Sequence, residues 1–146
     1  MITVTTHSAE ETTAFAEKIG KKLKSGDIIA FRGGLGAGKT TFTRGLAIGM
    51  GLPDEVSSPT FALVNEYRGK TTLCHFDMYR ITSGEALETT GFYDYLSDGC
   101  VAAVEWSENI AEFLPENIIT VTIEYKDENE RMISVEGDER FDNSWD

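Results

Sequence analysis

The hydrophobic positions of the first fifty residues change period twice. Three apolar residues recur every four positions behind a Ser-x-x-Glu capping box, which predicts a helix that begins at Ser8 and is stopped by Gly26. The apolar run at 28–31 then predicts a short strand, and the apolar face of 39–50 predicts a second helix. A strand that leads through a glycine-rich segment into a helix is therefore expected early in the chain.

The remaining sequence alternates between extended and helical patterns. Two strand-like runs flank a Gly-containing turn, a helical stretch is interrupted near Gly91, and a continuous apolar run is typical of a strand buried on both faces. A short helix with Ser107 as its N-cap and two alternating segments that can pair follow. In order, the expected segments are strands 61–67 and 71–76, helix 83–96, strand 100–104, helix 107–114, and strands 118–125 and 132–135.

This order of elements predicts an α/β fold with three layers, α/β/α, around a mixed sheet. The chain has 146 residues, of which 40% are hydrophobic and 26% charged, as in globular proteins. No internal repeat, low-complexity segment or linker divides it, so residues 1–146 are expected to form a single domain.

The charge balance limits the possible partners. Thirteen Lys and Arg residues stand against 25 Asp and Glu, a formal net charge of −12, which disfavours independent binding to DNA or RNA. The C-terminal end, 126–146, is acidic as well. Two interpretations of this end stay open: a solvated segment that aids solubility, or a surface that docks onto a basic partner.

The sequence also bears on compartment and redox chemistry. No apolar run approaches the ~20 residues of a membrane span, and the N-terminus lacks the features of a secretory signal. Cys74 and Cys100 form no CxxC pair and are expected to be small buried hydrophobic residues. The expectation is a reduced cytoplasmic protein without a membrane partner, and nothing indicates an obligate homo-oligomer.

Residues 33–40 satisfy the phosphate-loop pattern G-x-x-x-x-G-K-[ST]. Glycines let successive backbone N–H groups turn toward phosphate oxygens, and the following helix adds its positive dipole end. Lys39 is expected to reach the β- and γ-phosphates of ATP, and the Thr40 hydroxyl to bind Mg²⁺. The residues expected to contact the nucleotide are Gly33, Leu35, Gly36, Ala37, Gly38, Lys39, Thr40 and Thr41.

A phosphate loop also needs a carboxylate from a second strand. Asp77 and Glu105 each follow an apolar run, and both are candidates for holding Mg²⁺ or for acting as the catalytic acid. Glu105 ends the more continuous run, whereas Asp77 has the more usual side chain for this role. Between the loop and these acids, Thr60 in the segment 56–61 offers a hydroxyl to the metal or to attacking water.

Four motifs together resemble the TsaE family, the ATPase of the bacterial tRNA threonylcarbamoyladenosine machinery. The resemblance covers about residues 8–125, and the motifs occur in the family's order and at matching spacing: the loop at 33–44, Ser-Pro-Thr-Phe at 58–61, His-Phe-Asp-Met-Tyr-Arg at 75–80, and Glu-Trp-Ser-Glu at 105–108. It implies a compact P-loop fold, partnership with the TsaB and TsaD proteins, and ATP hydrolysis. The resemblance also implies that this hydrolysis supports repeated cycles of N6-threonylcarbamoylation at adenosine 37 of ANN-decoding tRNAs, and tRNA is expected to be reached only indirectly, through the complex.

The resemblance also implies roles for individual residues. Thr60 matches the family's switch threonine, Asp77 its Walker-B aspartate, and Glu105 with Trp106 its acid–aromatic motif beside the nucleotide. Thr12 matches a position near the adenine. Two of these assignments have alternatives that stay open, because Trp106 also suits core packing and Thr12 suits the first turn of a helix. The family's loop is usually acidic at position 34, where this chain has glycine.

Other nucleotide-dependent functions fit less well. A GTPase would carry N-K-x-D and D-x-x-G motifs, and neither occurs. A small P-loop kinase normally has a lid with several arginines, whereas the six arginines here are scattered. A nucleotide-sensing module with little turnover stays an alternative to an ATPase. His75 is expected to be a packed strand residue beside Asp77, not a ligand.

Overall fold

The computed structural model describes residues 1–33, 38–53, 56–57 and 64–141. Within these residues, eight strands form one mixed sheet in the order β1-β8-β7-β2-β6-β5-β4-β3. The central pairs β7–β2, β2–β6 and β6–β5 are parallel, and the outer pairs are antiparallel. The strands are β1 Ile2–Thr6, β2 Ile28–Arg32, β3 Val56–Ser57, β4 Val64–Tyr67, β5 Leu73–Asp77, β6 Val101–Glu105, β7 Ile119–Tyr125 and β8 Arg131–Glu136.

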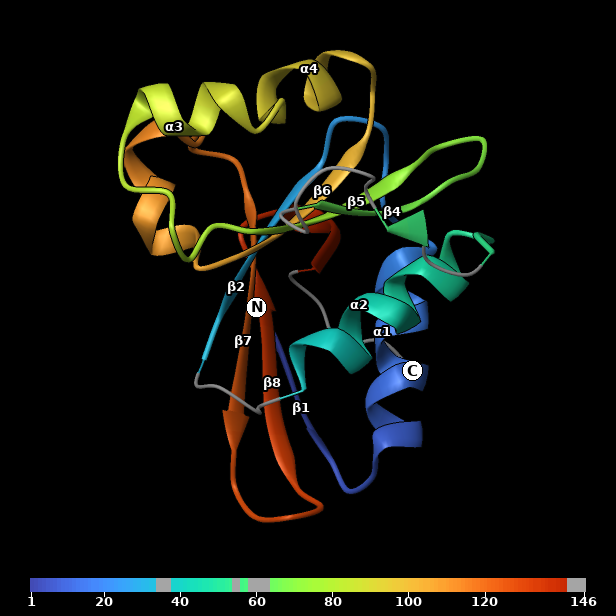
Figure 1. The fold of residues 1–146 in the computed structure, drawn as a ribbon. Helices are drawn as coiled ribbons and strands as arrows, with labels where there is room; N and C mark the ends of the chain where they lie inside the picture. The colour runs from blue at the N-terminus through green and yellow to red at the C-terminus, as the bar shows by residue number, and fades with distance from the viewer. Residues whose placement is uncertain (34–37, 54–55, 58–63, 142–146) are drawn as a thin grey trace.

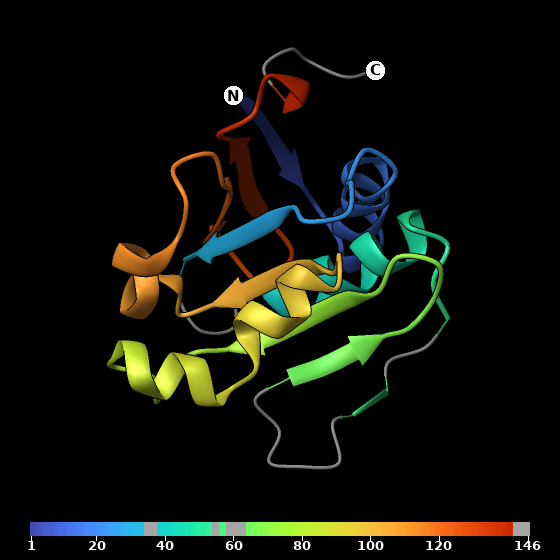
Figure 2. The ribbon, with the colours of Figure 1, turned by 90° about the horizontal axis from the view of Figure 1, so that it is seen from above.

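Helices cover both faces of this sheet, which gives the three expected layers (Figures 1 and 2). One face carries α1 and α2, which pack closely against each other, and the opposite face carries α3, α4 and the 3₁₀ helix η1. The bounds are α1 Ala9–Gly20, α2 Lys39–Gly49, α3 Gly84–Thr89, α4 Phe92–Ser97 and η1 Ser107–Phe113, followed by a short 3₁₀ turn, η2 Glu139–Phe141. The predicted α/β fold with a mixed sheet is confirmed.

The alternation of side chains along the strands builds two separate cores. In β6, Val101 and Ala103 point into the core under α1 and α2, whereas Ala102 and Val104 point into the core under α3, α4 and η1. All four are fully buried, as expected for a central strand with both faces covered. The same alternation continues one residue further, to Glu105, and thereby sets which face of the sheet this carboxylate joins.

Close contact between α1 and α2 fixes the position of α2. Gly45 lies against α1, where an added Cβ would come within 2.5 Å of the Cβ of Ala16, so the absence of a side chain permits the approach. Phe42 on α2 is completely buried and packs edge-to-face on Phe31 of β2, with ring centroids 5.9 Å apart. The first turn of α2 is therefore held at the carboxyl end of β2.

Local signals in the sequence account for most element boundaries. The Ser8 hydroxyl accepts a hydrogen bond from the Glu11 backbone N–H at 3.1 Å, as the capping box predicts. The helical stretch predicted at 83–96 is broken at Gly91, whose φ of +81° ends α3 and starts α4. The first helix ends at Gly20, earlier than predicted. The prediction of Ser107 as an N-cap is wrong: Trp106 holds that position, and the Ser107 hydroxyl instead donates to the Phe31 carbonyl at 3.2 Å.

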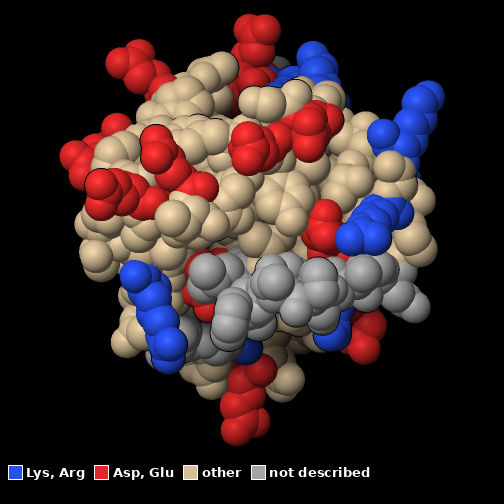
Figure 3. All heavy atoms as spheres, turned by 45° about the horizontal axis from the view of Figure 1, so that its top comes forward, with Lys and Arg blue, Asp and Glu red and all other residues tan. Residues whose placement is uncertain are grey.

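Surface charge is distributed unevenly over the layers. The sequence from 81 to 125, which includes α3, α4 and η1, contains no Lys or Arg. Figure 3 shows acidic side chains gathered on the side of the molecule that α3 and α4 cover. Among the described residues, no helix has the length and apolar character that crossing a bilayer would require.

Candidate functional site

The amino-terminal end of α2 is an open helix terminus. It follows β2 through Gly33 and Gly38, which both have positive φ values, +127° and +104°. No side chain caps this end, although the Gly38 carbonyl accepts the first helical hydrogen bond, from Phe42 N–H at 2.9 Å. Uncapped N–H groups and the helix dipole make such an end favourable for an anion.

Gly33 is required by packing as well as by its backbone conformation. A Cβ at this position would overlap the backbone carbonyl oxygen of Ile123 on β7. The chain therefore leaves β2 in close contact with the neighbouring strand before it reaches α2. Part of the predicted phosphate loop, namely Gly34, Leu35, Gly36 and Ala37, lies outside the described residues, as does the predicted switch residue Thr60. Their roles stay predictions.

The two predicted carboxylates lie on adjacent parallel strands. Asp77 ends β5 and Glu105 ends β6, and their Cα atoms are register partners. Both positions continue the alternation that faces α1 and α2, so both belong to the side of the sheet where α2 begins. Asp77 is exposed, and its carboxylate accepts a hydrogen bond from the Tyr79 backbone N–H at 3.0 Å. The structure thus brings the two candidates together at one edge of the sheet.

Glu105 has a partner that the sequence did not predict. The His75 imidazole lies 2.7 Å from the Glu105 carboxylate, Nε2 to Oε2, and only 9% of the His75 side chain is exposed. This hydrogen bond lowers the pKa of Glu105; burial opposes that effect, and the charges of His75 and Lys39 add to it. His75 is a packed strand residue, as predicted, but its contact is with Glu105. The alternation of β5 was the available signal, because it sets His75 and Asp77 on the same face.

Lys39 lies beside an aromatic pair. Its Nζ atom is 5.9 Å from the ring centroid of Trp106, and the Trp106 ring is 4.8 Å from that of Tyr79. Trp106 is the single non-glycine residue in the described part of the chain with a left-handed backbone, at φ 60° and ψ 38°. This conformation costs an L-residue about 1–2 kcal/mol, so the surrounding contacts must hold it.

Asn109 supplies part of that support. Its side-chain Nδ2 donates to the carbonyl oxygens of Met78 and Tyr79, at 2.9 and 3.1 Å, and so ties η1 to the segment after Asp77. Asn109 and this connection were not predicted from the sequence, where Tyr79 entered only as a member of the motif at 75–80. Nothing in the local pattern indicated them, because the contact joins residues thirty positions apart.

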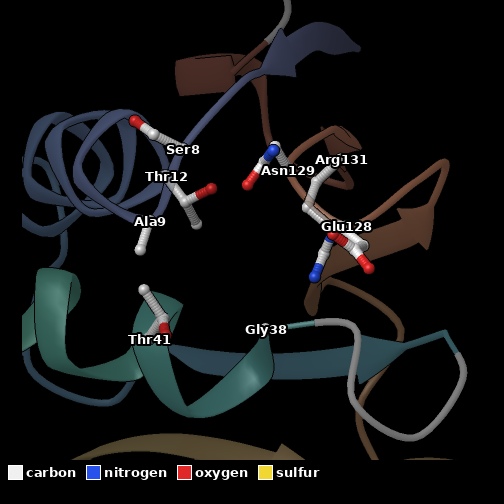
Figure 4. Close-up of a pocket in the computed structure, with 8 residues that line it drawn as sticks. All are labelled: Ser8, Ala9, Thr12, Gly38, Thr41, Glu128, Asn129 and Arg131. Carbon is white, nitrogen blue, oxygen red and sulfur yellow. The ribbon is translucent and has the colours of Figure 1, made fainter.

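A pocket of about 180 Å³ opens beside the start of α2 (Figure 4). Helix α1 contributes Thr12, whose buried hydroxyl is 2.7 Å from that of Thr6, and α2 contributes Thr41. The turn between β7 and β8 closes the opposite side, and Figure 4 shows the Asn129 side chain directed toward Thr12. The lining residues are Ser8, Ala9, Thr12, Gly38, Thr41, Glu128, Asn129 and Arg131. This turn was expected from the sequence as the link between two pairing strands, but not as a wall of this pocket.

The described residues suit magnesium only together with a ligand. No group of three or more His, Cys, Asp or Glu side chains in the described ranges forms a metal site by itself. Mg²⁺ commonly takes one or two protein carboxylates and completes its shell with phosphates and water. Asp77, Glu105 and the exposed Thr40 in the first turn of α2 offer that kind of partial shell.

A strand that leads through glycines into an uncapped helix, with carboxylates on the next parallel strands, defines an α/β protein of the P-loop NTPase fold class. Residues 6–133 match the family model of the Threonylcarbamoyl adenosine biosynthesis protein TsaE, so the chain belongs to the TsaE family. This family takes part in tRNA threonylcarbamoyladenosine (t6A) biosynthesis, and the predicted resemblance is confirmed.

Individual relatives agree with the family model. The tRNA threonylcarbamoyladenosine biosynthesis protein TsaE of Treponema pallidum is 37% identical over 128 residues, which cover 88% of this chain and 95% of that protein. The protein of the same name from Bacillus subtilis is 39% identical over 130 residues, covering 88% and 81%. The crystal structure of Bacillus subtilis YdiB superposes with a TM-score of 0.75 at 33% identity, covering 95% of this chain and 87% of that one.

Proposed function

We propose that this protein binds ATP with Mg²⁺ and hydrolyses it. The observation that carries the proposal is the convergence of Lys39, at the uncapped start of α2, with Glu105 and Asp77 at the ends of β6 and β5. A fixed cation, a positive helix end and two carboxylates on one edge supply what a nucleoside triphosphate and its metal require.

The proposal assigns a role to each of these groups. Lys39 binds the β- and γ-phosphates, Thr40 and Asp77 hold the metal, and Glu105 orients the attacking water. When bound, Mg²⁺ would neutralise the phosphate charge that develops during hydrolysis. We assign the adenine to the pocket between Thr12 and the β7–β8 turn, because that pocket adjoins Gly38 at the start of α2. It lies toward β7 and β8, whereas the two carboxylates end β6 and β5, on the other side of β2 in the sheet.

We further propose that the ATPase acts as an accessory subunit of a TsaB–TsaD assembly that installs t6A at position 37 of ANN-decoding tRNAs. Relatives bear the name of t6A biosynthesis proteins, which supports a place in this modification. The net charge of −12 and the acidic α3–α4 side suit contact with protein partners better than with RNA. A nucleotide-sensing module with little turnover is the alternative.

Reconstitution of the modification tests this function. Purified TsaB and TsaD, the enzyme supplying the threonylcarbamoyl group, and an ANN-decoding tRNA are incubated with and without this protein, and t6A per tRNA is measured by nucleoside mass spectrometry. The expected result is repeated turnover only when this chain and ATP are present. Lys39→Ala should behave like omission of the chain, and Lys70→Ala, at the opposite end of β5 from Asp77, should behave like the wild type.

Two outcomes would decide against parts of the proposal. Unchanged modification without this chain would remove it from the reaction. If a non-hydrolysable ATP analogue gave as much t6A per tRNA as ATP does, the nucleotide-sensing module would be favoured over the ATPase, because nucleotide binding alone would then be sufficient.

A further inference from the structure

The roles proposed above for the nucleotide site do not explain why Glu105 is hydrogen-bonded to His75. The Glu105 carboxylate is a pure acceptor when ionised, so the 2.7 Å contact requires that His75 Nε2 carries the hydrogen. The histidine is held in β5 and is 8% exposed overall, which leaves its ring little freedom. The His75 ring is therefore a rigid donor that fixes one carboxylate oxygen of Glu105, at the end of β6 on the side of the sheet where α2 begins.

The hydrogen bond from His75 to Glu105 matters because Lys39 is a possible alternative partner for Glu105. The charge of Lys39 also acts on Glu105, and among the described residues its Nζ lies 5.9 Å from the centroid of the Trp106 ring and is not paired with a carboxylate. A glutamate without its histidine would be free to rotate toward Lys39. An ion pair between them would compete with phosphate for the lysine.

We propose that His75 is a positioning residue that holds Glu105 away from Lys39 and thereby keeps this lysine available for the nucleotide phosphates. The inference rests on the proposed function, since it concerns the same site. His75 itself contacts no substrate in this assignment and acts only through Glu105. Its contribution should therefore vanish when Glu105 can no longer carry a negative charge.

Three variants separate this role from simple packing. His75→Leu places an apolar side chain in the same buried position and so removes the hydrogen-bond donor. His75→Gln retains an amide N–H at about the place of the imidazole Nε2, so it should restore the hydrogen bond. Glu105→Gln removes the charge that would compete for Lys39, and the double variant with His75→Leu closes a mutant cycle.

The measurement is the dissociation constant of ATP–Mg²⁺ by isothermal titration calorimetry, with circular dichroism confirming that each variant is folded. We expect His75→Leu to weaken binding about three- to tenfold, the scale of coupling between contacting charged residues. His75→Gln should bind like the wild type. In the Glu105→Gln background, the added His75→Leu substitution should change the dissociation constant by less than about twofold.

Other results would overturn the inference. An equal loss from His75→Leu in both backgrounds would show that the histidine acts on packing and not through Glu105. The same is true if His75→Gln binds as weakly as His75→Leu. Failure of the wild type to bind ATP would instead overturn the proposed function, and this role with it, so the two failures are distinguishable.

Discussion

Asp77 and Glu105 are register partners on adjacent parallel strands, yet their carboxylates have different surroundings. Asp77 is exposed and accepts a backbone N–H two residues further along its own chain, whereas Glu105 is partly buried and bonded to His75. An exposed carboxylate can exchange its water for a hydrated metal at low cost, and a fixed one can orient a single water. The difference favours separate roles for two residues that both stayed candidates for the metal ligand and the catalytic acid on sequence grounds.

Substitution of each acid should therefore have a distinct effect. We expect Asp77→Asn to reduce the dependence of ATP affinity on Mg²⁺, because the metal loses a charged ligand. Glu105→Gln should leave ATP–Mg²⁺ affinity nearly unchanged and lower the hydrolysis rate by about 10²-fold, the usual size of a lost general-base contribution. Calorimetry across a magnesium series and single-turnover hydrolysis measure the two effects. Equal and mild losses from both would mean that neither is the catalytic acid.

Lys39 should dominate nucleotide affinity. Charge-assisted hydrogen bonds contribute about 1.5–3 kcal/mol each, so Lys39→Ala is expected to weaken ATP–Mg²⁺ binding about 10- to 100-fold. Lys70→Ala changes the net charge by the same amount at the far end of β5 and is the matched control. Calorimetric titration of both variants gives the comparison, and a Lys39 variant that binds like the Lys70 variant would contradict the phosphate-loop assignment.

Gly33 should be far less tolerant of a side chain than a glycine that also has a positive φ but lies in open surroundings. Gly51 has a φ of +75° and nothing within 4 Å of an added Cβ, so Gly51→Ala should cost only the left-handed backbone penalty of about 1–2 kcal/mol. Gly33→Ala carries strain at φ +127° and also overlaps the Ile123 carbonyl, which should add roughly 1–3 kcal/mol. Urea unfolding of the two variants measures the difference, which should be absent if the chain at Gly33 can move away from β7.

The sequence predicted the fold well where apolar periodicity and glycines act locally. The strand at 28–31, the helix from Lys39 and the break at Gly91 all follow from neighbouring residues, and all are confirmed. The strand β1 was missed because its sequence, Ile-Thr-Val-Thr-Thr, is short and rich in threonine. It is stabilised by pairing with β8, some 130 positions away along the chain.

The candidate site was predictable only in part for the same reason. Motifs indicated Lys39, Asp77 and Glu105 because phosphate and metal chemistry restrict the residue types near them. The contacts that set their geometry are nonlocal: His75 reaches Glu105 from the neighbouring strand, and Asn109 reaches the carbonyls after Asp77. The left-handed backbone of Trp106 carries no sequence signal either, since tryptophan is not a residue that favours this conformation.

The contacts of Arg140 should make the free energy of unfolding decrease at acid pH. Its guanidinium donates to both carboxylate oxygens of Asp27, at 2.9 and 3.0 Å, and to Asp138, and so fastens η2 to the start of β2. Hydrogen bonds from Arg140 lower the pKa of Asp138 to about 2. Since this folded-state pKa lies below the unfolded value of about 3.9, the stabilisation is present above about pH 4 and is lost as the pH falls toward 2.

Arg140→Met, which keeps much of the apolar stem, tests this clamp. We expect a loss of about 1–3 kcal/mol at neutral pH, because hydrogen bonds to charged partners are removed from a side chain that is 19% exposed. The variant should also lose less stability than the wild type between pH 4 and pH 2. Lys126→Met breaks an exposed pair with Glu124 and should change the unfolding free energy by less than about 1 kcal/mol at either pH. Parallel acid sensitivity of wild type and Arg140→Met would contradict the clamp.

Hydrolysis should be slow for the isolated chain and faster with partners. The two arginines that end motifs, Arg44 and Arg80, are exposed, and no contact in the described part of the chain directs either toward Lys39. A cation supplied to the transition state raises phosphoryl-transfer rates by about 10³–10⁵, so a site without one is expected to turn over slowly. We predict at least several-fold stimulation of steady-state ATP hydrolysis by purified TsaB–TsaD.

The same titration at low and high salt tests how the partner is recognised. This protein has a net charge of −12 and no Lys or Arg between 81 and 125, so it should dock onto a basic surface of the partner. The apparent affinity of the two proteins should then fall as added salt shortens the Debye length from about 10 Å at 0.1 M. The unstimulated rate is the internal control, because it requires no docking and should therefore respond less to salt. Full activity of the lone protein, unaffected by saturating partner at either salt concentration, would point to an independent hydrolase.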